Sequence, residues 1–185
     1  MMGCTSSVQS KNQAVHPLVS SLVNNKVSIS VSEENKIILR ESWKTLDLRR
    51  TAAGKKVFAR LLELNPNLQD AFPSFRGVAL DEVMNSRSLF LHSKRLMAVV
   101  EETVLSLDDA KELIKDLTNL GERHLAMSIT EKHLKVMEEA FVLMLQDILE
   151  GSCSEQIIKA WRELFGFMAK TMLRGQEQAS NNLLS

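Results

Sequence analysis

The chain has 185 residues, of which 44% are hydrophobic, and its 23 basic and 23 acidic residues give a formal net charge of zero. This balance argues against a nucleic-acid partner, because such proteins carry a basic electrostatic footprint. Two cysteines are too few for a disulfide scaffold, and no apolar stretch approaches the roughly 20 residues that a transmembrane helix needs. The composition therefore predicts a soluble, intracellular, helical protein of one domain.

Residues 1–30 differ in composition from the rest of the chain. They are rich in Ser, Asn and Gln, they almost lack acidic residues, and their apolar residues follow no sustained period. Such a segment cannot bury enough apolar surface to fold, so we predict a flexible N-terminal tail. Residues 31–176 form the predicted domain, and residues 177–185 form a second, shorter tail.

Helical signals follow one another from Ser32 onward. Ser32 precedes two glutamates, which is typical of a helix start, and Asp108 with Asp109 and Thr130 give similar signals farther along. Asn65-Pro66 ends a helix, and residues 72–77 form a corner. Apolar residues at helical spacing predict an all-α domain of six or seven helices. The first helix begins at Ser32, and the later ones span residues 52–64, about 81–105, about 110–124, 131–151 and 154–173.

Two of the four histidines lie on the apolar stripes of their helices. His92 is flanked by leucines on one helix, and His124 is flanked by leucines on another. A histidine in such a position either hydrogen-bonds to a buried group or binds a metal ion, and for a single histidine the first reading is the more common. The sequence lacks the motifs of structural zinc, of zincin chemistry and of covalent haem attachment. Cys153 has no basic partner motif, so we predict no functional role for it.

Three segments resemble the globin family. Residues 56–62, followed by Pro66 and Phe72, resemble the globin B helix, the proline that opens the C helix and the phenylalanine of the CD corner. Residues 91–96 resemble the distal-histidine helix, and residues 120–124 resemble the proximal-histidine helix. The resemblance covers residues 32–175 and implies the globin fold, a 3-over-3 helical sandwich of about seven to eight helices. Shared strings place the likeness within the neuroglobin and globin X branches.

The resemblance implies a haem b cofactor with His124 as the proximal iron ligand and His92 on the distal side. The second ring nitrogen of His124 is then expected to donate to a backbone carbonyl of its own helix. Arg95 is a candidate for a haem propionate, with a solvated surface charge as the alternative. Plain helical core is the alternative for each of the apolar pocket residues, which are predicted to be Phe58, Phe72, Phe75, Leu96, Leu120, Ile129, Leu134, Met137 and Phe165.

The role of His92 decides which function is expected. If His92 ligates the iron, the protein resembles hexacoordinate globins of redox, NO or nitrite chemistry, oxidative protection or signalling, with O₂, CO, NO or nitrite as small ligands. A nitrite reductase or NO dioxygenase type of activity is compatible with this reading. If His92 only hydrogen-bonds to bound ligand, the protein is a pentacoordinate oxygen store or carrier. A haem-free helical regulator is the third reading. The electron-transfer partner is left open, as is the choice between monomer and homodimer.

The N-terminus resembles that of globin X. Gly3 and Cys4, with Ser7 four residues after Gly3, fit a myristoylation motif with an adjacent palmitoylation site, provided that the chain starts at Met2 rather than at Met1. The tail has no cluster of basic residues, so Cys4 would have to supply the second membrane signal. The resemblance thus implies a lipoprotein at the cytoplasmic face of the plasma membrane. A chance motif in a cytosolic protein is the alternative.

Overall fold

The computed structural model describes residues 29 and 31–184. The rest of the predicted tail, with Gly3 and Cys4, lies outside the described residues. Within them the chain forms seven α-helices and three short 3₁₀ helices, and no strand. The elements are α2 (Glu33–Asp47), α3 (Arg50–Leu64), η1 (Pro66–Ala71), α4 (Leu80–Asn85), α5 (Arg87–Leu105), α6 (Ala110–His124), η2 (Leu125–Met127), α7 (Glu131–Leu149), η3 (Glu150–Ser152) and α8 (Glu155–Leu184).

Three of the predicted helix starts are confirmed by side-chain caps. The Ser32 hydroxyl accepts from the backbone N–H of Asn35, and the Asp109 carboxylate accepts from that of Glu112, both at 3.2 Å. Thr130 caps α7 in the same way, and Nδ1 of His133 accepts a hydrogen bond from the Thr130 N–H. Each cap pairs a backbone N–H that the first helical turn would otherwise leave unpaired.

Two predicted helix boundaries are wrong. The single helix predicted over residues 81–105 is divided at Ser86, whose backbone is extended and whose hydroxyl caps α5 at the N–H of Leu89. The last helix does not end at Leu173 but continues to Leu184. Nothing in residues 174–184 stops a helix, because this segment lacks proline and Gly175 is held in helical geometry by close packing on α6.

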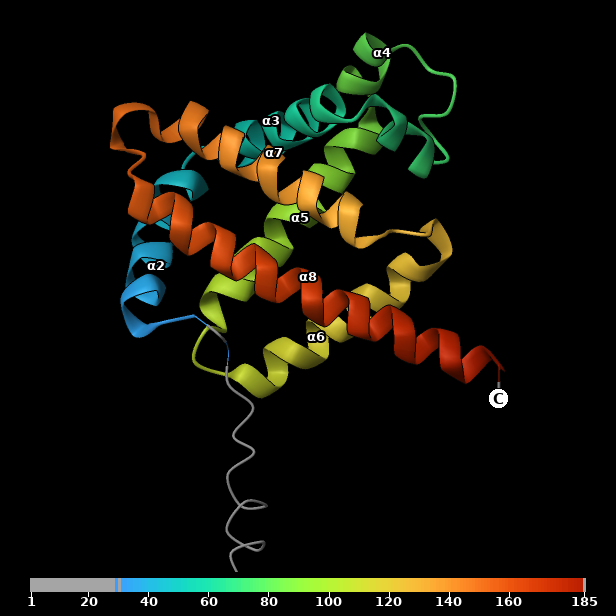
Figure 1. The fold of residues 1–185 in the computed structure, drawn as a ribbon. Helices are drawn as coiled ribbons and strands as arrows, with labels where there is room; N and C mark the ends of the chain where they lie inside the picture. The colour runs from blue at the N-terminus through green and yellow to red at the C-terminus, as the bar shows by residue number, and fades with distance from the viewer. Residues whose placement is uncertain (1–28, 30, 185) are drawn as a thin grey trace, which may run out of the picture.

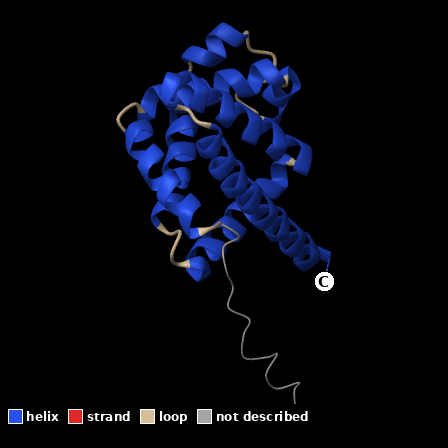
Figure 2. Ribbon diagram, turned by 60° about the vertical axis from the view of Figure 1, so that its left-hand side comes forward, coloured by secondary structure: helices blue, strands red, loops and turns tan. Residues whose placement is uncertain are grey.

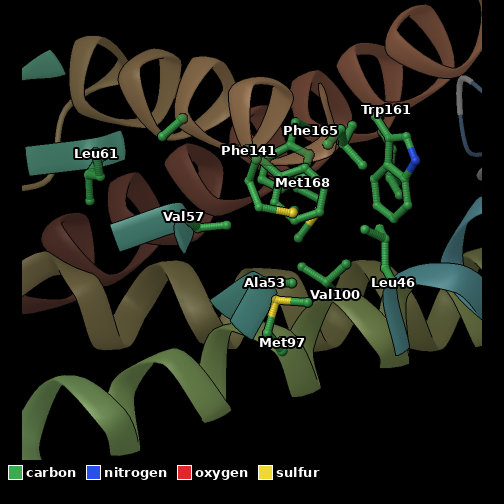
Figure 3. Close-up of a cluster of buried hydrophobic side chains, with 14 of the residues drawn as sticks. Leu46, Ala53, Val57, Leu61, Met97, Val100, Phe141, Trp161, Phe165 and Met168 are labelled. Atoms are coloured by element: carbon green, nitrogen blue, oxygen red, sulfur yellow. The ribbon is translucent and has the colours of Figure 1, made fainter. Parts of the chain in front are cut away.

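The helices form two layers, with α2, α5 and α6 in one and α3, α7 and α8 in the other (Figures 1 and 2). This is the predicted 3-over-3 arrangement. The core between the layers holds Trp161 and Phe141, whose ring centroids lie 4.9 Å apart, over Val57 and Met97 (Figure 3). The indole N–H of Trp161 donates to the Ser42 hydroxyl at 3.0 Å, so this buried polar group is paired.

The corner predicted at residues 72–77 is present, and a side chain outside it fixes its shape. The amide nitrogen of Gln69 donates to the carbonyl oxygens of Phe75 and Val78, both at 2.7 Å. Gly77 has φ +70°, a left-handed conformation that glycine adopts without strain. The corner therefore has a defined path, and this path carries Phe72 toward α5.

Candidate functional site

The two histidines of the apolar stripes lie on α5 and α6, which diverge from the connection at residues 106–109 (Figure 1). α5 packs on α3 and α2, whereas α6 packs on α8, so α5 and α6 share little direct contact. A hollow of about 180 Å³ lies between them, and its walls include Val99, Leu117 and Leu120. A larger depression, of about 380 Å³, lies on the α3 side of α5, and neither His92 nor His124 lines either hollow.

The His92 ring is half-buried between two aromatic side chains. Phe58 and Phe72 both meet it edge-on, with ring centroids 5.2 Å from the imidazole. No hydrogen bond to another described residue pairs either ring nitrogen. Burial, then the charges of His124 and Arg95, hold the pKa of His92 below its ordinary value. His92 therefore presents a neutral imidazole with a free lone pair.

The His124 ring is oriented by its own helix. Its Nδ1 lies 2.8 Å from the carbonyl oxygen of Leu120. Because a carbonyl only accepts, Nδ1 carries the proton in this pair and Nε2 keeps its lone pair. The expected hydrogen bond from His124 to its own helix is thus confirmed. The charge of His124 contributes to the lowered pKa of His92, although 32 positions separate the two residues in sequence.

A family model described as "Globin" matches residues 55–172, which is most of the chain. The chain belongs to the globin family.

Individual relatives agree with this assignment. This globin is 29% identical to neuroglobin of Danio rerio over 146 residues, which cover 78% of this chain and 92% of the relative. It is 28% identical to neuroglobin-2 of Oncorhynchus mykiss over the same share of both chains. The predicted resemblance to globins of the neuroglobin type is confirmed.

Solved structures support the fold. A hexacoordinated heme protein from an anhydrobiotic tardigrade superposes with a TM-score of 0.74 at 22% identity, covering 80% of this chain and 97% of that protein. Haemoglobin of the botfly Gasterophilus intestinalis gives 0.72 at 15% identity, covering 79% and 99%. The all-α globin fold is confirmed.

Membership of the globin family implies haem as the cofactor, and the residues present fit it. Iron is bound by neutral imidazole, and both His92 and His124 have a ring nitrogen available for a metal. The flat porphyrin is a large apolar ligand, and Phe58, Phe72 and Leu120 supply apolar surface beside the two imidazoles. Among the described residues no group of three or more His, Cys, Asp or Glu side chains is placed to hold a metal ion.

The other predicted pocket residues fall into different environments. Phe75 is fully buried and contacts the Phe72 ring at 5.1 Å rather than the histidine. Phe165 lies in the core cluster, 4.5 Å from Phe141, which favours its alternative reading as plain core (Figure 3). Arg95 is exposed, yet its charge reaches His92. The residues that are half-buried are Leu96, Leu120, Ile129, Leu134 and Met137.

Two residues around the site had no functional signal in sequence. Gln69 braces the corner that carries Phe72, but its partners are backbone carbonyls six and nine positions away, which no local pattern reveals. Gly121 lies in the sequence string shared with neuroglobins. That string identified the helix, but it did not indicate that Gly121 packs closely against the backbone of α8.

Replacing Phe72 and Phe75 by alanine is expected to separate haem retention from stability. Phe72→Ala removes a ring that contacts His92, so haem loss to an acceptor globin should be about tenfold faster. Phe75→Ala leaves a cavity in the core, so it should cost about 3–5 kcal/mol of unfolding free energy. Stopped-flow haem transfer and urea denaturation measure the two effects. Equal haem-loss rates for the two variants would show that Phe72 does not occupy the predicted position at the CD corner.

Proposed function

We propose that this globin holds haem b between His92 and His124, with both imidazoles bound to the iron when no other ligand is present. The observation that carries the proposal is the state of His92. This imidazole is half-buried, has no hydrogen-bond partner among the described residues, and stands close enough to His124 to be affected by its charge. A metal ion bound there would use a ring nitrogen lone pair that no other described residue occupies.

The chain's own residues control access to the bound haem. Haem supplies one-electron chemistry and the binding of small gas ligands. His124 is pre-oriented by Leu120, which fixes the tautomer and strengthens the imidazole as a ligand. Phe58 and Phe72 keep water from the distal side and limit rotation of the His92 ring. O₂, CO, NO or nitrite must compete with His92, so their apparent affinity falls with the fraction of open sites.

We infer redox, NO or nitrite chemistry, oxidative protection or signalling rather than bulk oxygen transport. The chain has no tyrosine, so no phenol is available to donate a hydrogen bond to bound O₂. A pair of imidazole ligands changes geometry little between oxidation states, which suits electron transfer. The relatives point in the same direction, since they are named neuroglobins and one structural neighbour is described as hexacoordinated.

The visible spectrum of the purified ferrous protein tests the proposal. Sharp α and β bands without added ligand are expected for two imidazoles on the iron. One broad band would instead favour the pentacoordinate oxygen store or carrier. Absence of a Soret band after haem reconstitution would favour the haem-free regulator.

We further propose that the N-terminus anchors the protein to the cytoplasmic face of a membrane. In the described residues no helix is both long and apolar enough to cross a bilayer. Gly3 fits N-myristoylation when translation starts at Met2. A single myristoyl chain binds membranes only marginally, so palmitoylation of Cys4 would supply the second attachment.

The variant Gly3→Ala, expressed from Met2, is expected to move to the cytosol, because it removes the acceptor of the first acyl chain. Cys4→Ser should be released only in part, since the myristoyl chain remains. Fractionation of cells labelled with a myristate analogue measures both effects. Recovery of Gly3→Ala in the membrane at the wild-type level would exclude acyl anchoring.

A further inference from the structure

The backbones of α6 and α8 touch at a crossing that two glycines make possible. A Cβ atom at Gly121 would lie 2.0 Å from the carbonyl oxygen of Met172, and a Cβ atom at Gly175 would lie 2.2 Å from that of Thr118. The two contacts are reciprocal, because each glycine faces a backbone carbonyl of the other helix. Backbone atoms cannot rotate away as side chains do, so any larger residue must push the helices apart.

This crossing is the main attachment of α6 to the rest of the described chain. α8 passes across α6 (Figure 1), and no other helix packs extensively on it. His124 lies one helical turn after Gly121 and is tied by its Nδ1 to that same turn. The position of the His124 ring therefore depends on how closely α6 approaches α8.

We propose that Gly121 and Gly175 are positioning residues that set the placement of His124 opposite His92. The inference rests on the proposed haem function. Contacts of Cβ atoms below 3.0 Å essentially never occur, so alanine at either position must move α6 by about 1 Å. A displacement of this size at a metal ligand changes the strength of the metal bond without removing the ligand.

The chain offers a matched control in the same helix. Gly166 lies in α8, and a Cβ atom built there meets nothing within 4 Å. Gly166→Ala makes the same chemical change and should stabilise the helix slightly, because alanine is the better helix former. It should leave His124 where it is.

The test compares Gly121→Ala, Gly175→Ala and Gly166→Ala, each in a His92→Leu background, where His124 is the sole axial histidine. The readouts are the iron–histidine stretching frequency in the ferrous protein and the rate of haem loss. We expect both glycine-crossing variants to shift the frequency and to lose haem about tenfold faster, as changes around a metal ligand typically do. We expect Gly166→Ala to match its parent in both.

A second comparison separates positioning from general destabilisation. In His124→Gly with added imidazole, the iron ligand is no longer tethered to α6. Adding Gly121→Ala to that variant should then change haem affinity less than twofold. An undiminished effect would contradict the proposal, as would an unchanged stretching frequency in both crossing variants. Failure of both to fold would also contradict it, since the crossing would then determine folding as a whole. Failure of the parent to bind haem would overturn the proposed function instead. The inference would then be decided on the haem-free proteins, in which hydrogen exchange of α6 is expected to be faster in the crossing variants than in Gly166→Ala.

Discussion

His124→Ala is expected to fold and to lose stable haem binding. The substitution removes the imidazole that α6 orients through Leu120, and His92 alone then has to hold the iron. We expect the Soret absorbance that survives gel filtration to fall by more than tenfold. Circular dichroism of the haem-free protein should remain helical, because the His124 side chain is half-buried outside the central core cluster.

The matched control for this experiment is His133→Gln. His133 is a helical imidazole whose Nδ1 accepts from the backbone N–H of Thr130 at the start of α7. Glutamine can make the same reciprocal bond, so the cap is retained while a histidine is lost. Full haem retention is expected for His133→Gln. Equal retention by His124→Ala would mean that His124 is not the proximal ligand.

His92→Leu is expected to keep haem and to bind CO faster than the wild-type protein. In the wild type CO must wait for His92 to leave the iron, so the observed rate is reduced by the fraction of closed sites. Leucine fills the space beside Phe58 and Phe72 but has no lone pair for the metal. We expect the bimolecular CO rate to increase by more than tenfold, measured by stopped flow.

Leu91→Ala provides a control on the neighbouring position. Leu91 is 39% exposed, so truncation there alters α5 without touching the predicted iron site. Its CO kinetics should match the wild type. A ferrous spectrum of His92→Leu identical to that of the wild type would show that His92 does not bind the iron.

The helix starts and the histidine pair could be predicted because their signals are local. The side chains of Ser32, Asp109 and Thr130 each accept a hydrogen bond from the backbone N–H three residues later, a spacing that a sequence pattern captures. His92 and His124 stand out because helical periodicity places each on an apolar stripe. That periodicity also identifies the faces that meet, so most of the fold follows from it.

The misplaced boundaries and the supporting contacts depend on tertiary structure. Ser86 is tolerated inside helices, and its role as a cap becomes evident only when α4 and α5 are placed. Gly175 suggests a helix end, yet it allows α8 to pass the Thr118 carbonyl and continue. Gln69 bonds to carbonyls of the corner that folds back over it. The partners of Gly175 and Gln69 are backbone carbonyls at least six positions away in sequence, so no local residue pattern identifies them.

A crystal structure of the haem-loaded ferrous protein without added ligand would show directly which side chains bind the iron. We expect the iron to be bonded to Nε2 of His124 and to a ring nitrogen of His92, with Phe58 and Phe72 beside the distal imidazole. A structure with His124 bound, His92 turned away from the iron and the sixth position open would contradict it.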